Sequence, residues 1–251
     1  MFDYPLTILF ALTGISFLAY VIKTTTGFGT AIIIVSFGSL LIGTHEAVVL
    51  SAVIDTFGGI ILFSRDPVVD GRSFWVPLSI AMIAGSVAGG ILLSVIPAES
   101  FDLLLAVVIT ILGIWFVAGR GKDGEASLEQ ELPSRCSKSD LSVSAFAGLC
   151  GGLFAVSGPP IVYWLGRRFV KHSFRRALIA VFFFATIFRL ITYGAVGLLH
   201  TNLWMPALFT VPGIILGIIL GNRIFIALSE RAFSRVVGTI LIFVGIRLLL
   251  K

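Results

Sequence analysis

The feature that most constrains this chain is a succession of long apolar runs separated by short polar segments. A helix needs about 20 apolar residues to cross a bilayer. The apolar runs are Pro5–Ile22, Ala31–Ile42, Ala47–Phe63, Phe74–Ile96, Phe101–Ala118, Leu141–Val156, Ile161–Leu165, Ala177–Val196, Leu203–Ile226 and Phe233–Leu250. With 57% hydrophobic and 12% charged residues, the composition excludes a soluble domain. The sequence therefore predicts an all-α polytopic membrane protein.

The only long hydrophilic stretch divides the chain into two halves. It runs from Gly119 to Asp140, so we expect a first transmembrane repeat at 1–120, a linker at 121–140 and a second repeat at 141–251. Each half opens with a segment interrupted by glycines and continues with three ordinary spans. Matching halves with interrupted segments in corresponding places are typical of secondary transporters.

The distribution of Lys and Arg favours halves of opposite orientation. If each interrupted segment crosses the membrane once, the halves are parallel and the basic residues divide equally between the two faces. If each enters and returns, as two short spans or a re-entrant hairpin, one face gathers 15 of the 18 basic residues. Lys23 is counted on that face, and Arg189 alone lies within a span. Basic residues accumulate on the cytoplasmic side, so we predict inverted repeats with both termini non-cytoplasmic.

The two interruptions predict a binding site within the membrane. Irregular backbone is tolerated there only where protein buries it or where it lines a wet cavity. A helix that begins at mid-depth presents free N–H groups and a partial positive charge, which bind anions. The expected binding residues are Thr25, Thr26, Gly27, Phe28, Gly29 and Thr30 in the first half, and Gly151, Gly152, Ser157, Gly158 and Pro159 in the second. The alternative interpretation is that these glycines only allow close helix packing.

The two interrupted segments also carry a family resemblance. The sequences GFGTAIIIVSFGSLL (27–41) and GLCGGLFAVSGPPIVYWL (148–165) each open a half of the chain, and they resemble the corresponding segments of the TauE/SafE family of sulfite and organosulfonate exporters. The first differs from the family pattern at Thr30 and Ala31, where glycine is usual, and at Ser36 and Phe37, where proline is usual. The resemblance implies secondary transport of small sulfur-containing anions, commonly export.

Two charged residues lie well inside predicted spans. Arg189 stands in FFFATIFRLITYG and Asp55 in SAVIDTFGG, and an ionisable residue at such depth is a functional candidate. A guanidinium can hold an oxyanion in a two-pronged fork. Asp55 could pair with Arg189, couple a proton to transport, or serve a structural role. Full pairing would neutralise Arg189, so these interpretations compete unless protonation of Asp55 releases the arginine.

The residues therefore predict a transporter of sulfonates or sulfite, in which Arg189 and Asp55 act near the midplane. The alternative is a carrier or channel for another anion, such as a carboxylate. An intramembrane enzyme is disfavoured, because no histidine lies within a span and Asp55 is the only mid-span acid. We expect no cofactor and no metal site. The expected partners are a small anion and the lipid of a bacterial inner membrane, with no nucleic acid and with a homo-oligomer left open.

Overall fold

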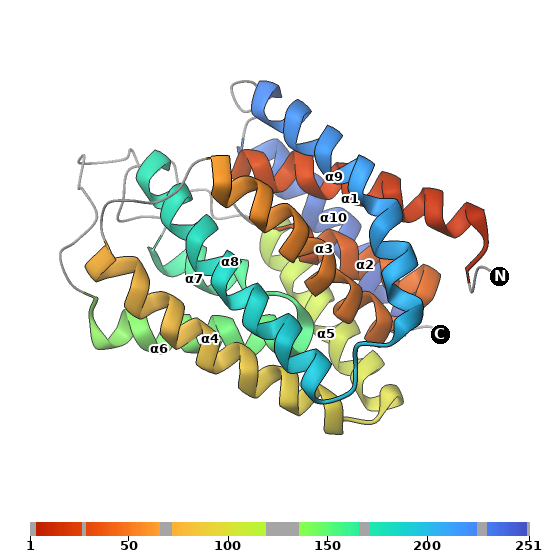
Figure 1. Ribbon diagram of the computed structural model, residues 1–251, viewed down its shortest axis with the longest axis horizontal. Coiled ribbons are helices and arrows are strands. Elements are labelled where there is room, and N and C mark those ends of the chain that lie inside the picture. The colour runs from red at the N-terminus through yellow and green to blue at the C-terminus, as the bar shows by residue number, and fades with distance from the viewer. Residues whose placement is uncertain are drawn as a thin grey trace.

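Helices make up the structure, a computed structural model that describes residues 4–26, 29–65, 72–118, 136–165, 171–224 and 230–249 (Figure 1). The first half holds α1 (Leu6–Thr26), α2 (Thr30–Ile42), α3 (Thr44–Arg65), α4 (Arg72–Val95) and α5 (Ala98–Val117). The second half holds α6 (Lys138–Phe154), α7 (Gly158–Leu165), α8 (Lys171–Ala195), the short 3-10 turn η1 (Thr201–Leu203), α9 (Trp204–Ile224) and α10 (Glu230–Leu249). The described residues contain no strand, as the sequence predicted.

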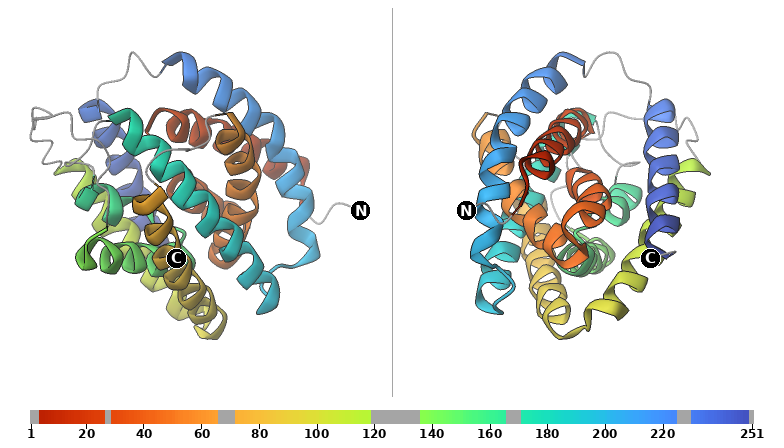
Figure 2. Two further views of the ribbon diagram at one scale, coloured as in Figure 1. Left: turned by 60° about the vertical axis from the view of Figure 1, so that its left-hand side comes forward. Right: turned by 90° about the vertical axis from the view of Figure 1, so that its right-hand side faces the viewer.

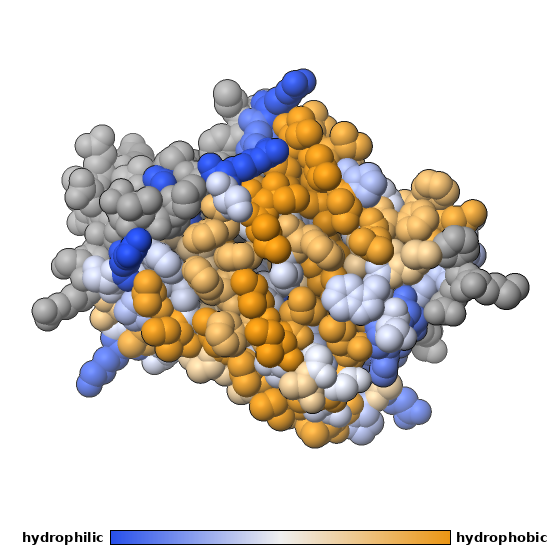
Figure 3. All heavy atoms as spheres, viewed as in Figure 1, coloured by the Kyte–Doolittle hydropathy of each residue, from blue (hydrophilic) through white to orange (hydrophobic). Residues whose placement is uncertain are grey.

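The outer surface of the helices is apolar, as a bilayer requires. Six of the described helices are long and apolar enough to cross a membrane, namely α1, α3, α4, α5, α8 and α9. Large apolar side chains such as Phe10, Val95 and Phe243 are about two-thirds exposed, and apolar residues cover most of the face seen in Figure 3. Such exposure would be unfavourable in water over so wide an area. The chain is an integral multi-pass membrane protein.

The main helix contacts join one half to the other. Helix α1 packs along α9, α4 packs along α6, and α5 packs along α10. If α1 to α5 are matched in order with α6 to α10, then α1 corresponds to α6 and α4 corresponds to α9. The contact of α1 with α9 is then the counterpart of the contact of α6 with α4. The third pair then joins matching helices. Figure 2 shows the result, with α2 near the middle and α4, α5, α9 and α10 around it.

Glycines allow the backbones of α4 and α6 to touch. A Cβ on Gly85 or Gly89 of α4 would overlap carbonyl oxygens of α6. A Cβ on Gly148 or Gly152 of α6 would likewise overlap carbonyl oxygens of α4. Small residues at a membrane helix interface permit this approach and gain van der Waals contact. Part of the glycine pattern therefore serves packing, as the alternative interpretation of the sequence held.

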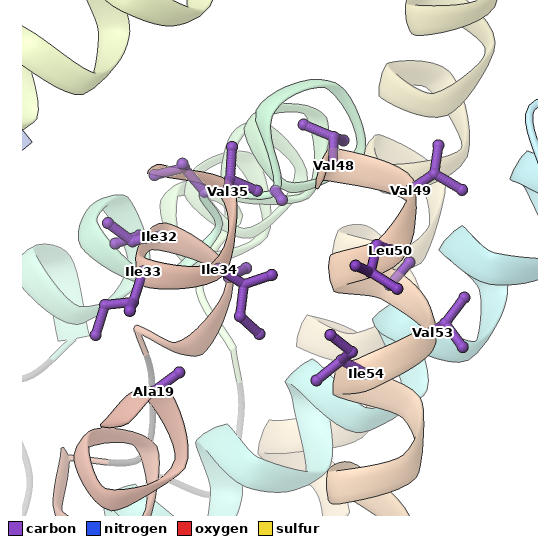
Figure 4. Close-up of a cluster of buried hydrophobic side chains, with 14 of the residues drawn as sticks. Ala19, Ile32, Ile33, Ile34, Val35, Val48, Val49, Leu50, Val53 and Ile54 are labelled. Atoms are coloured by element: carbon purple, nitrogen blue, oxygen red, sulfur yellow. The ribbon is translucent and has the colours of Figure 1, made fainter. Parts of the chain in front are cut away.

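The buried core is centred on the interrupted half-helix of the first repeat. Ile32, Ile33, Ile34 and Val35 of α2 are all buried, and Ile34 points toward Ile54 of α3 (Figure 4). Beta-branched side chains have restricted rotamers, so this contact fixes α2 firmly against α3. The packing positions the first turn of α2 beside the middle of α3, where Asp55 stands.

Both chain ends lie on the same side of the structure. In Figure 1 the termini are at the right, whereas the first turns of α4, α6 and α8 are at the left. The first turns of α4 and α6 hold Arg72 and Lys138, and Arg176 stands in the second turn of α8. The sequence assigned all three residues to one membrane face. Opposite orientation of the halves stays a prediction, taken up below.

Candidate functional site

The first interruption lies between α1 and α2. Helix α1 continues to Thr26, four residues beyond the predicted end at Ile22, because nothing before Gly27 opposes a helix. Helix α2 begins at Thr30, and Gly29 before it has a φ of 98°, which glycine adopts far more readily than other residues. Thr25 and Thr26 thus belong to the last turn of α1, and Gly27 and Phe28 lie outside the described residues.

The second interruption lies between α6 and α7. Helix α6 ends at Phe154, and Ala155 follows in the left-handed conformation with a φ of 61°. The N–H of Ala155 donates to the Gly151 carbonyl at 2.9 Å and that of Val156 to the Cys150 carbonyl at 3.3 Å, which closes the helix end. Helix α7 then begins with Gly158, Pro159 and Pro160, because proline fits the first turn, where its missing N–H has no intrahelical partner.

The beginnings of α2 and α7 meet at one cavity of about 30 Å³. Its walls are formed by Gly29, Thr30, Ala31 and Ile32 of the first interruption, Ala155, Ser157 and Gly158 of the second, and Lys23, Asp55, Phe182, Thr186 and Arg189 from the surrounding helices. Such a volume has room for about two water molecules. The positive ends of two half-helices therefore share a polar cavity inside the membrane protein.

Three charged side chains meet at the cavity. Lys23 Nζ lies 2.8 Å from Asp55 Oδ1, and Arg189 Nη2 lies 3.5 Å from Asp55 Oδ2. All three side chains are less than a tenth exposed. Two cations face a single carboxylate, so the cluster carries one positive charge in excess when Asp55 is ionised. The predicted proximity of Asp55 and Arg189 is present, but Lys23 is a third member that the sequence did not indicate.

Arg189 has hydrogen-bonding capacity left over. Its Nη1 donates to the Gly151 carbonyl at 3.0 Å, in the last turn of α6. Its Nε and Nη2 are buried and have no hydrogen-bond partner among the described residues. A buried charged donor without an acceptor is unfavourable, so these N–H groups are suited to a ligand oxygen.

Tyrosines on both sides hold the cluster in place. Tyr193, one turn beyond Arg189 on α8, is fully buried and its hydroxyl donates to the Gly152 carbonyl at 2.6 Å. Tyr20, one turn before Lys23 on α1, donates to the Ile54 carbonyl at 2.9 Å. Its ring lies 5.5 Å from Lys23 Nζ, a cation–π distance. A Cβ on Gly58 would overlap this ring.

The structure gathers six of the thirteen predicted site residues at this cavity. Gly29, Thr30, Asp55, Ser157, Gly158 and Arg189 line it. Gly151 and Gly152 are not among the lining residues. Their carbonyls accept hydrogen bonds from Arg189 and Tyr193, respectively. Pro159 is buried in the first turn of α7, and the side chains of Thr25 and Thr26 lie outside the described residues.

Lys23 is the site residue that sequence reasoning missed. The inverted topology counts it on the cytoplasmic face, on the condition that the first segment crosses the membrane fully. The available signal was its position one turn before a glycine break, which places it at the depth of that break. Its identity as a partner of Asp55 depends on the packing of α1 and α2 on α3.

The described residues offer no metal centre. They contain no group of three or more His, Cys, Asp or Glu side chains placed to hold an ion. Cys136 and Cys150 are free thiols. Burial, with the neighbouring Asp140 carboxylate, raises the pKa of Cys136 to about 11.

Comparisons with known proteins give a family match and a similar protein. The protein family described as sulfite exporter TauE/SafE matches residues 12–248. A protein of Cupriavidus necator, described as a probable sulfite/organosulfonate exporter TauE, is 30% identical over 238 residues. That match covers 91% of this chain and 88% of the relative. No solved structure matches this chain.

Proposed function

The chain belongs to the TauE/SafE family of sulfite exporters, and from this premise we propose that it exports small sulfur-containing anions, such as sulfonates or sulfite, across a bacterial inner membrane. It is a membrane transporter and not an enzyme, as its family is. The observation that carries the substrate proposal is the buried cluster of Lys23, Asp55 and Arg189 with its one excess positive charge.

The cluster can attract an anion strongly because it is shielded from water. Two unit charges 4 Å apart interact by about 4 kcal/mol at an effective dielectric constant of 20, against about 1 kcal/mol in bulk water. The free Nε and Nη2 of Arg189 form a fork that suits two oxygens of a sulfonate or sulfite group. The amides at the beginning of α2 and α7 add partial positive charge to the walls of the cavity.

Transport requires the cavity to enlarge and to face each side of the membrane in turn. A cavity of about 30 Å³ is smaller than a sulfonate, so the site must widen for the anion to bind. We propose that the halves are inverted repeats that rock against each other around the site, as in other secondary transporters. The corresponding contacts α1 with α9 and α4 with α6 support a repeat of this kind.

We propose that Asp55 couples the anion to a proton. An ionised Asp55 holds Lys23 and Arg189 and leaves one positive charge for the anion. A proton on Asp55 would free both cations and so change the charge and the anion affinity of the site during the cycle. The titratable or charged groups around it are Tyr20, Lys23 and Arg189. Substitution Asp55→Asn is expected to abolish proton-dependent transport in proteoliposomes, while the purified variant still binds anions. Transport by this variant that still follows a pH gradient would reject Asp55 as the coupling group.

The substrate proposal is tested by binding and flux of defined anions. Sulfite, taurine, isethionate and carboxylate analogues are compared for their ability to raise the melting temperature of the purified protein, because ligands that bind the folded state stabilise it. Efflux from proteoliposomes is then measured for those that bind. We expect the sulfur anions to be preferred. Binding and flux of carboxylates alone would replace the proposal with the carboxylate carrier.

The orientation of the halves is tested by labelling. Ser139 at the start of α6 and Asn222 at the end of α9 are both exposed. Each is replaced by cysteine in a chain without Cys136 and Cys150, and labelled with a membrane-impermeant maleimide. Inverted halves predict that both sites react from the cytoplasmic side. Reaction from opposite sides would indicate parallel halves and remove the proposed rocking motion.

A further inference from the structure

Asp55 is placed to do more than hold two cations, because it sets the charge of the whole cavity. Among the residues that line the cavity, the charged ones are Lys23, Asp55 and Arg189. When Asp55 is ionised, the net charge of these three side chains is one positive charge. We infer that Asp55 is the residue that determines substrate valence, so that the site with Asp55 ionised takes a monovalent oxyanion such as an alkanesulfonate and excludes a divalent one such as sulfate. This inference rests on the proposed function.

The physical reason is that a buried site must be neutralised by its ligand. A charge that is left without compensation inside a protein is strongly unfavourable. One monovalent anion brings the four-member cluster to zero, whereas a divalent anion leaves one negative charge in excess. Shape does not make the distinction, because the sulfonate group and sulfate present similar tetrahedral oxygens to the Arg189 fork.

The donors for such a ligand are already present and unused. Nε and Nη2 of Arg189 are buried, and neither has a hydrogen-bond partner among the described residues. The remaining nitrogen, Nη1, is committed to the Gly151 carbonyl at 3.0 Å. Lys23 Nζ approaches Asp55 Oδ1 closely at 2.8 Å, whereas Arg189 Nη2 stands at 3.5 Å from Oδ2. The looser contact is the one that an incoming anion would replace.

Four chains that differ in charge at two positions test the inference. The natural chain carries one excess positive charge, Asp55→Asn two, Lys23→Gln none, and the double variant Lys23→Gln/Asp55→Asn again one. Glu99→Gln removes a carboxylate on the exposed surface and serves as the matched control. Methanesulfonate and sulfate are titrated into each purified full chain at equal ionic strength, since salt screens charge, and binding is read from the shift in melting temperature.

The expected result is a preference that follows charge rather than residue identity. The natural chain, Glu99→Gln and the double variant favour methanesulfonate, and Asp55→Asn reverses the preference toward sulfate by at least about tenfold. Lys23→Gln loses binding of both ions. If the Asp55→Asn chain does not fold, the double variant tests the inference. Its methanesulfonate binding should be restored relative to Lys23→Gln, and absence of that binding overturns the inference.

Two further outcomes separate this inference from the proposed function. If Asp55→Asn still prefers methanesulfonate, the charge count does not set valence, and the inference fails while sulfonate transport stands. If the natural chain binds neither ion and moves no sulfite or sulfonate in proteoliposomes, the proposed function fails and the inference fails with it.

Discussion

The two interrupted segments resemble each other in shape and differ in chemistry. In the first half, α1 brings a lysine to the cavity and α3 brings the carboxylate that pairs with it, 2.8 Å away. In the second half, α6 and α7 contribute no charged side chain to the cavity walls. Arg189 comes instead from the neighbouring α8, and one of its nitrogens donates to the end of α6.

This difference indicates that the repeat supplies a scaffold and that each half adds a separate function to it. In both halves a short helix, α2 or α7, begins at the same cavity. This arrangement requires only glycine, proline and helix packing. The first half adds an internal ion pair that is electrically neutral. The second adds the single cation that makes the cavity positive. An anion site therefore arises only where the two halves meet.

The largest effect is expected from removing the carboxylate of the first half. Asp55→Ala leaves Lys23 and Arg189 buried without a counter-ion, and breaking a buried pair in this way costs about 3–5 kcal/mol of stability. Thermal unfolding in a buffer without oxyanions measures the loss, and added sulfate should recover part of it by supplying negative charge. Unchanged stability in both buffers would show that the three charges do not interact.

Removing the cation of the second half should abolish function with a smaller effect on stability. Arg189→Gln leaves the neutral Lys23–Asp55 pair and removes a charge-assisted hydrogen bond to the Gly151 carbonyl, worth about 1.5–3 kcal/mol. We expect loss of sulfite efflux and of anion-induced stabilisation. The control is Arg247→Gln, at an exposed position near the end of α10. Efflux that survives in Arg189→Gln would assign the anion to the first half alone.

The close contact between halves predicts a third effect, on the scaffold itself. Gly148→Val places a side chain against the Met82 carbonyl of α4, and overpacking of this kind costs about 1–3 kcal/mol. Gly14→Val is the matched control, since a Cβ at Gly14 meets nothing within 4 Å. Chemical denaturation in detergent compares the two variants. Equal stability would mean that α4 and α6 do not touch as closely as the structure shows.

The two buried tyrosines offer the smallest and most sharply matched comparison. Tyr193→Phe removes a hydrogen bond to the Gly152 carbonyl, which lacks a helical partner because the N–H of Val156 donates to Cys150. Tyr20→Phe removes a hydrogen bond to Ile54, whose carbonyl lies inside α3. We expect about 1–3 kcal/mol for the first and about 0.5–1.5 kcal/mol for the second. Equal losses in thermal unfolding would argue against a special role for the end of α6.

Sequence reasoning reached the parts of this protein that local signals report. Apolar run length predicted the spans, and glycine and proline inside such runs predicted the two interruptions. Asp55 and Arg189 were visible as charges deep within apolar segments. These signals need only short stretches of chain and the chemistry of the bilayer.

The rest of the site depends on contacts between distant segments. Lys23 joins Asp55 across 32 positions of sequence, and Tyr20 fits beside them only because residue 58 is a glycine. Gly151 was predicted to bind the substrate, and in the structure its carbonyl accepts a hydrogen bond from Arg189. Such pairings follow from how helices are rotated against one another, and neither periodicity nor composition specifies that rotation.

The most direct test of the account is to locate a bound anion. Crystals grown with bromoethanesulfonate would show the bromine by its anomalous scattering, and the sulfonate by density beside it. The account predicts the sulfonate group in contact with both Lys23 and Arg189, between the beginnings of α2 and α7. A sulfonate bound elsewhere, in a protein that still transports the compound, would contradict it.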